Sequence, residues 1–236
     1  MLQPRTYPEM LGKALVLEAD PFIAMVDDDE PWAEGLFMVV VVGLTVGLAR
    51  LIGGWLTAAA LPPLDATIEA LINGWQQLNA QLGLGIDPAA ADAAIRSVVD
   101  LAAGYNGMGG GWTSLFVLVA TPTGFVLQWL FYALIAHLVA RLMGGTGSFS
   151  QTLGALALVM APQALRILTA IPFVSVSGLL LIVWSMLISY RALEVAHELP
   201  WRRAAWTAVM PPVVVTVLIA GITLLTGIVL AMGGGA

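Results

Sequence analysis

Apolar and polar residues occur along the chain in long blocks, and five of the blocks are almost entirely apolar. A helix needs roughly 20 mostly apolar residues to cross the hydrocarbon core of a bilayer. The pattern therefore predicts an all-α, polytopic bundle of five transmembrane helices, at residues 35–57, 115–139, 153–171, 174–190 and 209–231. Residues 1–34, which precede the first span, are expected to form an acidic cytosolic segment with a short helix.

Residues 62–111, between the first two spans, form an insertion with a different periodicity. Apolar residues recur there every three or four positions, which is typical of amphipathic helices. Gly83 interrupts the pattern, and Asp87 followed by Pro88 predicts the start of a second helix. Helices that lie on a membrane surface usually carry Lys and Arg, whereas this pair is acidic, which favours packing on the protein itself or on a partner over packing on lipid. The expected apolar face of the first helix is formed by Leu64, Ile68, Leu71, Trp75 and Leu78.

Two prolines shape the third span. Pro162 predicts a bend near Leu158, because proline has no amide hydrogen to donate to the carbonyl four residues earlier. Pro172 is expected to close a tight hairpin between the third and fourth spans.

Small residues predict close contacts and turns. Gly43 and Gly47 are four residues apart in the first span, a spacing that allows two helices to approach closely. Their neighbour is either another span of the bundle or a second chain. Gly144 and Gly145 predict the turn that follows the second span, with Ser150 as the cap of the third.

The composition excludes several classes of protein. Of the 236 residues, 59% are hydrophobic and 10% are charged, against about 25% charged in soluble domains. The chain has no cysteine, which excludes disulfides and thiolate chemistry. Its net charge of −6 and its lack of clustered Lys and Arg argue against a nucleic-acid partner.

The basic residues predict the orientation of the spans. Cytoplasmic loops carry an excess of Lys and Arg. If the N-terminus lies in the cytosol, the segments on the outer side of the membrane carry one basic residue, Arg96. The segments on the cytosolic side then carry six, which are Arg5, Lys13, Arg141, Arg191, Arg202 and Arg203. We therefore expect a multi-pass protein of the cytoplasmic (inner) membrane, with its N-terminus in the cytosol and its C-terminus outside.

Two arginines lie within the predicted spans, where ionisable residues are costly and are functional candidates by default. Arg50 and Arg166 lie in the outer half of their spans, within reach of the surface for a long side chain. Each is expected to meet either a lipid phosphate or a carboxylate of the insertion, such as Asp65, Glu69 or Asp100.

Catalytic and cofactor groups are scarce. The predicted spans contain no Asp or Glu, which argues against proton relays and cation-coupled transport. His137 is a candidate ligand for a pigment or haem, and a polar contact between helices is its simpler interpretation. We expect no enzyme activity, no metal site and no cofactor other than bound lipid.

Several motifs occur in a characteristic order. After "KALVLEADPF" and the first span come "RLMGGTGSFSQTL", "APQALRILTAIPF", Trp184 within the fourth span, and "YRALEVAHELPWRRAAW". In this order they resemble the Yip family of Ypt/Rab-interacting-protein-like membrane proteins, in its bacterial branch. The resemblance implies a five-span helical fold with a cytosolic N-terminus. For eukaryotic relatives it also implies binding of lipid-modified small GTPases, a role that we do not extend to this chain.

Three functions remain open. The first is an accessory or scaffolding subunit of a larger membrane assembly, such as a photosynthetic or respiratory complex, with other integral subunits as partners. The second is a Yip-like adaptor that recruits a cytosolic protein. The third is a small transporter or lipid-handling protein, which the arginines and proline bends within the spans favour.

Overall fold

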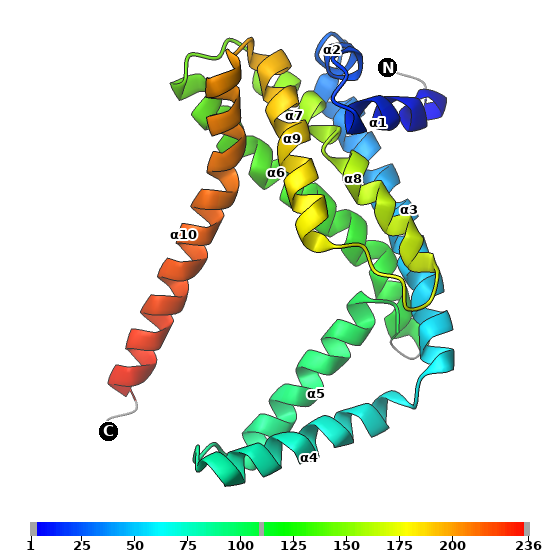
Figure 1. Cartoon of the computed structure of the whole chain (residues 1–236), viewed down its shortest axis with the longest axis vertical. Coiled ribbons are helices and arrows are strands. Elements are labelled where there is room, and N and C mark those ends of the chain that lie inside the picture. The colour runs from blue at the N-terminus through cyan, green and yellow to red at the C-terminus, as the bar shows by residue number, and fades with distance from the viewer. Residues whose placement is uncertain (1–3, 109–110, 234–236) are drawn as a thin grey trace. The chain divides into compact units, whose positions relative to one another are not determined.

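The computed structural model describes residues 4–108 and 111–233, and these described residues form helices and connecting turns with no strand. Five helical segments are long and apolar enough to cross a membrane. They are α3 (Pro31–Ala60), α6 (Phe116–Leu142), the segment Phe149–Ala170, α9 (Gly178–His197) and α10 (Trp201–Gly233) (Figure 1). The predicted all-α membrane fold with five spans is therefore confirmed.

The long helices extend beyond the apolar blocks that predicted them. α3 begins at Pro31 and includes Glu34, and α9 continues to His197 and includes Glu194. Two carboxylates therefore lie near the ends of these helices, although the predicted spans contained none. Hydropathy locates only the apolar middle of a helix, whereas the hydrogen-bonded backbone continues until a cap or a breaker ends it.

The third span is broken where Pro162 predicts a bend. α7 (Phe149–Ala157) ends one residue before Leu158, and α8 (Met160–Ala164) and the 3-10 helix η3 (Leu165–Ala170) follow. The carbonyl of Leu158 does not lose its partner, because the chain tightens and the amide of Ala161 donates to it at 2.9 Å. Pro172 lies in the connection 171–177 ahead of α9.

The cap of the third span is Ser148 rather than the predicted Ser150. The Ser148 hydroxyl accepts from the amide of Gln151, and the Gln151 side chain accepts from the amide of Ser148, which completes a capping box. The hydroxyl of Ser150 instead accepts from the backbone amide of Trp32 at 3.3 Å.

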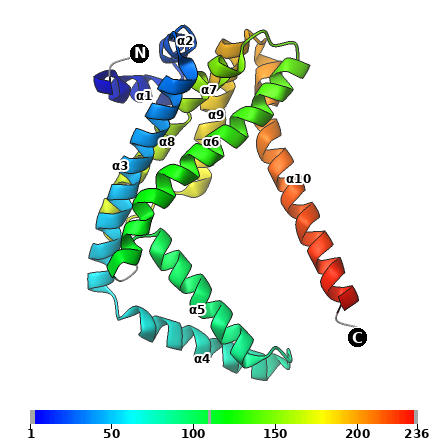
Figure 2. The same ribbon diagram turned by 180° about the vertical axis from the view of Figure 1, so that it is seen from behind.

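The helices divide into two compact units, which are described separately. The first unit comprises the residues up to Val39, Val126–Pro162 and the residues from Leu179 onward. It contains η1 (Pro4–Thr6), α1 (Tyr7–Leu15) and α2 (Asp20–Val26), and α2 packs against α7 (Figures 1 and 2). Phe22 and Met25 of α2 are fully buried in this contact region.

Two polar side chains hold the N-terminal helices in the first unit. The hydroxyl of Tyr7 donates to Oε1 of Glu34 at 2.5 Å, and both residues are buried. The indole of Trp184, in α9, donates to the carbonyl of Leu15 at 2.9 Å. The N-terminal segment is thus a packed part of the unit rather than only an acidic leader to the first span.

The start of α10 is also anchored in this unit. Pro212 cannot donate to the carbonyl of Ala208, which therefore lacks its usual partner. The hydroxyl of Tyr132, in α6, donates to this carbonyl at 2.6 Å, and Ala204, Thr207 and Ala208 are buried. From Val213 to Gly227 α10 is largely exposed, and only 11% of its most apolar stretch is buried.

The second unit comprises Val40–Phe125 and Gln163–Gly178. Within it α4 (Leu64–Leu82) and α5 (Pro88–Tyr105) lie side by side as a hairpin, and η2 (Gly111–Leu115) leads into α6 (Figures 1 and 2). Gly83 ends α4 in the left-handed conformation, at φ +60°. The Asp87 side chain caps α5 by accepting from the amide of Ala89 at 3.1 Å. The predicted helix pair and its cap are confirmed.

Candidate functional site

Two arginines from distant parts of the chain line one pocket in the second unit. Arg50 lies on α3, Arg166 lies on η3, and they share a pocket of about 340 Å³. The sequence predicts that both residues lie in the outer half of their spans. It does not predict that they line a common pocket. The pocket brings together every intramembrane arginine that the sequence singled out.

Arg50 is the more buried of the two. Its side chain is only 9% exposed, and its Nη1 is buried without a hydrogen-bond partner. Its Cζ lies 4.7 Å from the centroid of the Tyr105 ring, a cation–π contact with the last residue of α5. The ring offers the guanidinium a cation–π contact but no hydrogen-bond acceptor, and Nη1 stays without a partner.

Arg166 is half-buried and held by its own segment. Its Nε donates to Oε1 of Gln163 at 2.8 Å, and its carbonyl accepts from the hydroxyl of Thr169 at 2.6 Å. The positive charges of Arg50 and Arg166 repel each other across the pocket. The lining contains no Asp or Glu to offset them.

The predicted pairing of these arginines with carboxylates of the insertion is not realised. In residues 4–108 and 111–233, the ion pairs join Lys13 with Glu9 and Arg191 with Glu194. The proposed acidic partners, Asp65, Glu69 and Asp100, are all exposed on the α4–α5 hairpin. A carboxylate that water can solvate gains little from joining a buried cation.

Glycines bring the walls of the pocket together. A Cβ on Gly53 would lie 1.8 Å from the carbonyl oxygen of Thr169, and one on Gly54 would lie 2.4 Å from that of Asn106. Gly107, which follows Asn106, adopts a left-handed conformation with φ +73° against the backbone of Arg50. The backbone can approach α3 this closely only because these positions have no side chain.

Gly43 and Gly47 pack within the second unit. A Cβ on Gly43 would lie 2.6 Å from the Cα of Pro122, and one on Gly47 would lie 3.3 Å from the carbonyl oxygen of Val117. Of the two neighbours that the sequence left open, the structure places α6 of the same chain against both glycines.

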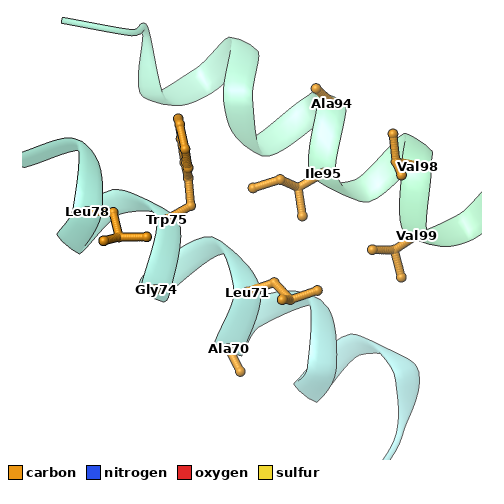
Figure 3. Close-up of a pocket in the computed structure, with 9 residues that line it drawn as sticks. All are labelled: Ala70, Leu71, Gly74, Trp75, Leu78, Ala94, Ile95, Val98 and Val99. Carbon is orange, nitrogen blue, oxygen red and sulfur yellow. The ribbon is translucent and has the colours of Figure 1, made fainter. Parts of the chain in front are cut away.

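A second hollow, which we name the hairpin groove, lies between α4 and α5. It has a volume of about 640 Å³ and is lined by apolar side chains and small residues. Figure 3 shows Trp75 and Leu78 of α4 on one side of it and Ile95 and Val98 of α5 on the other. Its lining is Ala70, Leu71, Gly74, Trp75, Leu78, Ala94, Ile95, Val98 and Val99.

The apolar face predicted for α4 is divided between two roles. Ile68 is 2% exposed and belongs to the core of the second unit, and Leu64 is half-buried. Leu71, Trp75 and Leu78 line the hairpin groove, where Leu71 and Leu78 are about half exposed. The indole nitrogen of Trp75 is buried and has no hydrogen-bond partner.

His137 belongs to a cluster in the first unit. Its Nδ1 lies 2.9 Å from the hydroxyl of Thr152, and the same hydroxyl lies 2.9 Å from Nε2 of His197. The Thr152 hydroxyl also donates to the carbonyl of Ser148 at 2.8 Å. With its hydrogen used there, the hydroxyl oxygen accepts an N–H from each imidazole, so one threonine links α6, α7 and α9.

The sequence did not identify Thr152 or His197 as partners of His137, because they come from different helices. Thr152 is fully buried and His197 is 1% exposed, whereas His137 is only partly buried. Over the part of the chain that the structure describes, no group of three or more His, Asp or Glu side chains is placed to hold a metal ion. Ligation of a pigment by His137 remains a prediction that would have to use Nε2.

Comparison with known proteins identifies the family. The model of the Yip1 domain matches residues 14–222, which include the whole second unit with its α4–α5 hairpin and most of the first unit. No curated protein and no solved structure matches the chain. Because the match spans most of the sequence, the chain belongs to the Yip1-domain family of membrane proteins.

Proposed function

We propose that this protein is a non-catalytic accessory or scaffolding subunit of a larger membrane assembly, and that it receives an apolar helix of another integral subunit in the hairpin groove. The observation that carries the proposal is the groove itself. It is apolar, it lies between two helices that are too polar to cross a bilayer, and its leucines are about half exposed.

The chemistry of the hairpin favours a protein over a lipid surface. Its exposed carboxylates would be repelled by anionic lipid headgroups, and they include Asp65, Glu69 and Asp100. The unpartnered indole N–H of Trp75 requires an acceptor in a buried setting. A backbone carbonyl near the end of a partner helix supplies one.

The expected topology is consistent with this role. With the N-terminus in the cytosol, as the distribution of basic residues predicts, the hairpin lies on the outer side of the cytoplasmic membrane. A partner would then contact the hairpin through a helix that ends near that surface, as the terminal part of a transmembrane helix does.

Site-specific photo-crosslinking in the native membrane tests the proposal. A benzophenone amino acid at Val98, which is 66% exposed and lines the groove, is expected to capture one integral membrane protein, identified by mass spectrometry. Leu78→Glu in the same chain should abolish this product. Leu101→Glu is the matched control, because Leu101 is 70% exposed on α5 but lies outside the groove. Capture of lipid alone, or of a second copy of this chain alone, would refute the proposal.

The Yip-like adaptor is the second candidate, and one surface favours it. Trp201 and Trp206, at the start of α10, are each about 60% exposed, and Cζ of Arg202 lies 5.1 Å from the Trp201 ring centroid. This aromatic and basic surface would face the cytosol in the expected topology. A crosslinker at Trp206 that captures a soluble protein, together with no product at Val98, would favour the adaptor.

A further inference from the structure

We infer that Arg50 and Arg166 form a binding site for a phosphate group, in the pocket that both side chains line. The inference is independent of the hairpin groove and of any partner that the groove receives. Its basis is an incompletely satisfied cation, a second cation beside it and a pocket between them.

The first step is the unfilled hydrogen bond of Arg50. A buried N–H of a charged group that finds no acceptor is costly, and native proteins rarely leave one without a reason. Nη1 of Arg50 is such a group, although the side chain is more than nine-tenths buried and lines an open pocket. An acceptor that enters the pocket and reaches this buried nitrogen would satisfy it.

The second step is the charge of the pocket. Two guanidinium groups face about 340 Å³ of space whose lining has no carboxylate. The two positive charges repel each other in the empty pocket, which costs free energy. An anion bound between them would attract both guanidinium groups and offset that cost. The site therefore selects for negative charge.

The third step is the kind of anion. A guanidinium presents a planar set of N–H donors that matches the oxygen atoms of phosphate. Tyr105 and Gln163 hold the two guanidinium groups by a ring contact and a hydrogen bond, so less freedom is lost when a ligand binds. The lining also contributes polar groups from Thr57, Asn106 and Ser175.

The fourth step is the source of the phosphate. The same pocket is lined by Ile171, Phe173 and Val174, and Phe173 is 69% exposed. This combination of exposed apolar residues and two cations suits a lipid. Its acyl chains would pack on the apolar residues while its headgroup contacts the arginines. Inorganic phosphate has the same headgroup chemistry without the chains, so the two sources can be separated by experiment.

The test uses the purified full-length chain in a neutral detergent, with native mass spectrometry as the readout. The probes are dioleoylphosphatidylglycerol, dioleoylphosphatidylcholine and inorganic phosphate. We expect saturable binding of phosphatidylglycerol, with markedly weaker binding of phosphatidylcholine because that lipid has no net charge. Competition by inorganic phosphate would assign the recognition to the phosphate group alone, and its failure to compete would assign it to the intact lipid.

Variants locate the site. Arg50→Gln and Arg166→Gln should each weaken phosphatidylglycerol binding by about tenfold or more, because each removes hydrogen bonds to a charged group. Arg50→Lys should be intermediate, since it keeps the charge but loses the planar fork. Arg96→Gln is the matched control, because Arg96 is an exposed cation of the same unit that does not line the pocket.

Three outcomes would overturn the inference. They are absence of anion binding by the wild-type chain, equal binding of the two lipids, and equal loss of binding in Arg96→Gln and the pocket variants. If Arg50→Gln does not fold, as shown by size-exclusion chromatography, Arg166→Gln and the wild-type comparison of the two lipids decide the matter.

Discussion

Gly43→Ala tests the close packing of α3 against α6. The new Cβ would lie 2.6 Å from Cα and 2.9 Å from Cβ of Pro122, distances that force the backbone of α6 to move. Overpacking of this kind costs about 1–3 kcal/mol, whereas replacing a glycine inside a helix by alanine gains about 0.5–1 kcal/mol. The difference is a net loss of up to about 2.5 kcal/mol, with a central value of about 1 kcal/mol, which for a chain of this size lowers Tm by about 2–4 °C.

The matched control is Gly124→Ala, on the opposing helix two positions after Pro122. A Cβ at Gly124 meets nothing within 4 Å, so this variant has the helix-propensity gain without the clash. Thermal unfolding of both variants in detergent, followed by tryptophan fluorescence, should show Gly43→Ala below the wild type and Gly124→Ala at or slightly above it. If Gly43→Ala has the same Tm as Gly124→Ala, α3 and α6 are not in the close contact described, and the reasoning is refuted.

Two further predictions concern the first unit. Thr152→Val removes the hydroxyl that His137 and His197 share, and leaving buried ring nitrogens unpaired should lower the free energy of unfolding by about 1–3 kcal/mol. In the exposed control Thr223→Val, the lost hydroxyl donates only to the carbonyl of Ile219 in its own helix, so the free energy of unfolding should change by no more than about 0.5 kcal/mol. Equal losses in the two variants, measured by denaturant titration, would contradict a shared role for the Thr152 hydroxyl. Burial, and then the hydrogen bond to Glu34, raise the pKa of Tyr7 above its ordinary value of 10.0. The folded state thus favours the neutral phenol, so this contribution to stability is complete below about pH 10 and is lost as the pH rises further. Between about pH 8 and 11 the wild type should therefore lose more stability than Tyr7→Phe in thermal unfolding, and parallel curves would contradict the assignment.

Local features of the fold could be predicted from the sequence because their causes are local. Apolar length located the five spans, and Asp87 with Pro88 located the start of α5. The cap of α7 also has a local signal, because Ser148 and Gln151 have the spacing of a capping box. Ser150, the cap predicted above, lies two residues later and does not have this spacing to Gln151. The tightening at Leu158 was not readable, since proline predicts a lost donor but not which amide replaces it.

The sites depended on contacts between distant segments, which periodicity does not encode. Arg50 and Arg166 were identifiable as costly intramembrane charges, but only the fold shows that they share a pocket and that Tyr105 stacks on one of them. Likewise, nothing in the spacing of His137, Thr152 and His197 brings three helices to one hydroxyl. Charge alone favours the carboxylates of the insertion as partners of the arginines, whereas the fold leaves Asp65, Glu69 and Asp100 exposed.

The double proline of α10 has a consequence for how the protein responds to bilayer thickness. α10 has 33 residues and is therefore about 50 Å long, well beyond the roughly 30 Å of a hydrocarbon core. Its first turns are fixed by Tyr132 and the buried residues around Ala208, whereas the part beyond the prolines contacts little protein. A helix longer than the hydrocarbon core can accommodate the excess length by tilting or kinking, and the two prolines are the positions of α10 at which its hydrogen-bond ladder is interrupted. We therefore expect differences in bilayer thickness to be accommodated by the part of α10 that follows Pro212, while the start of the helix stays anchored by Tyr132.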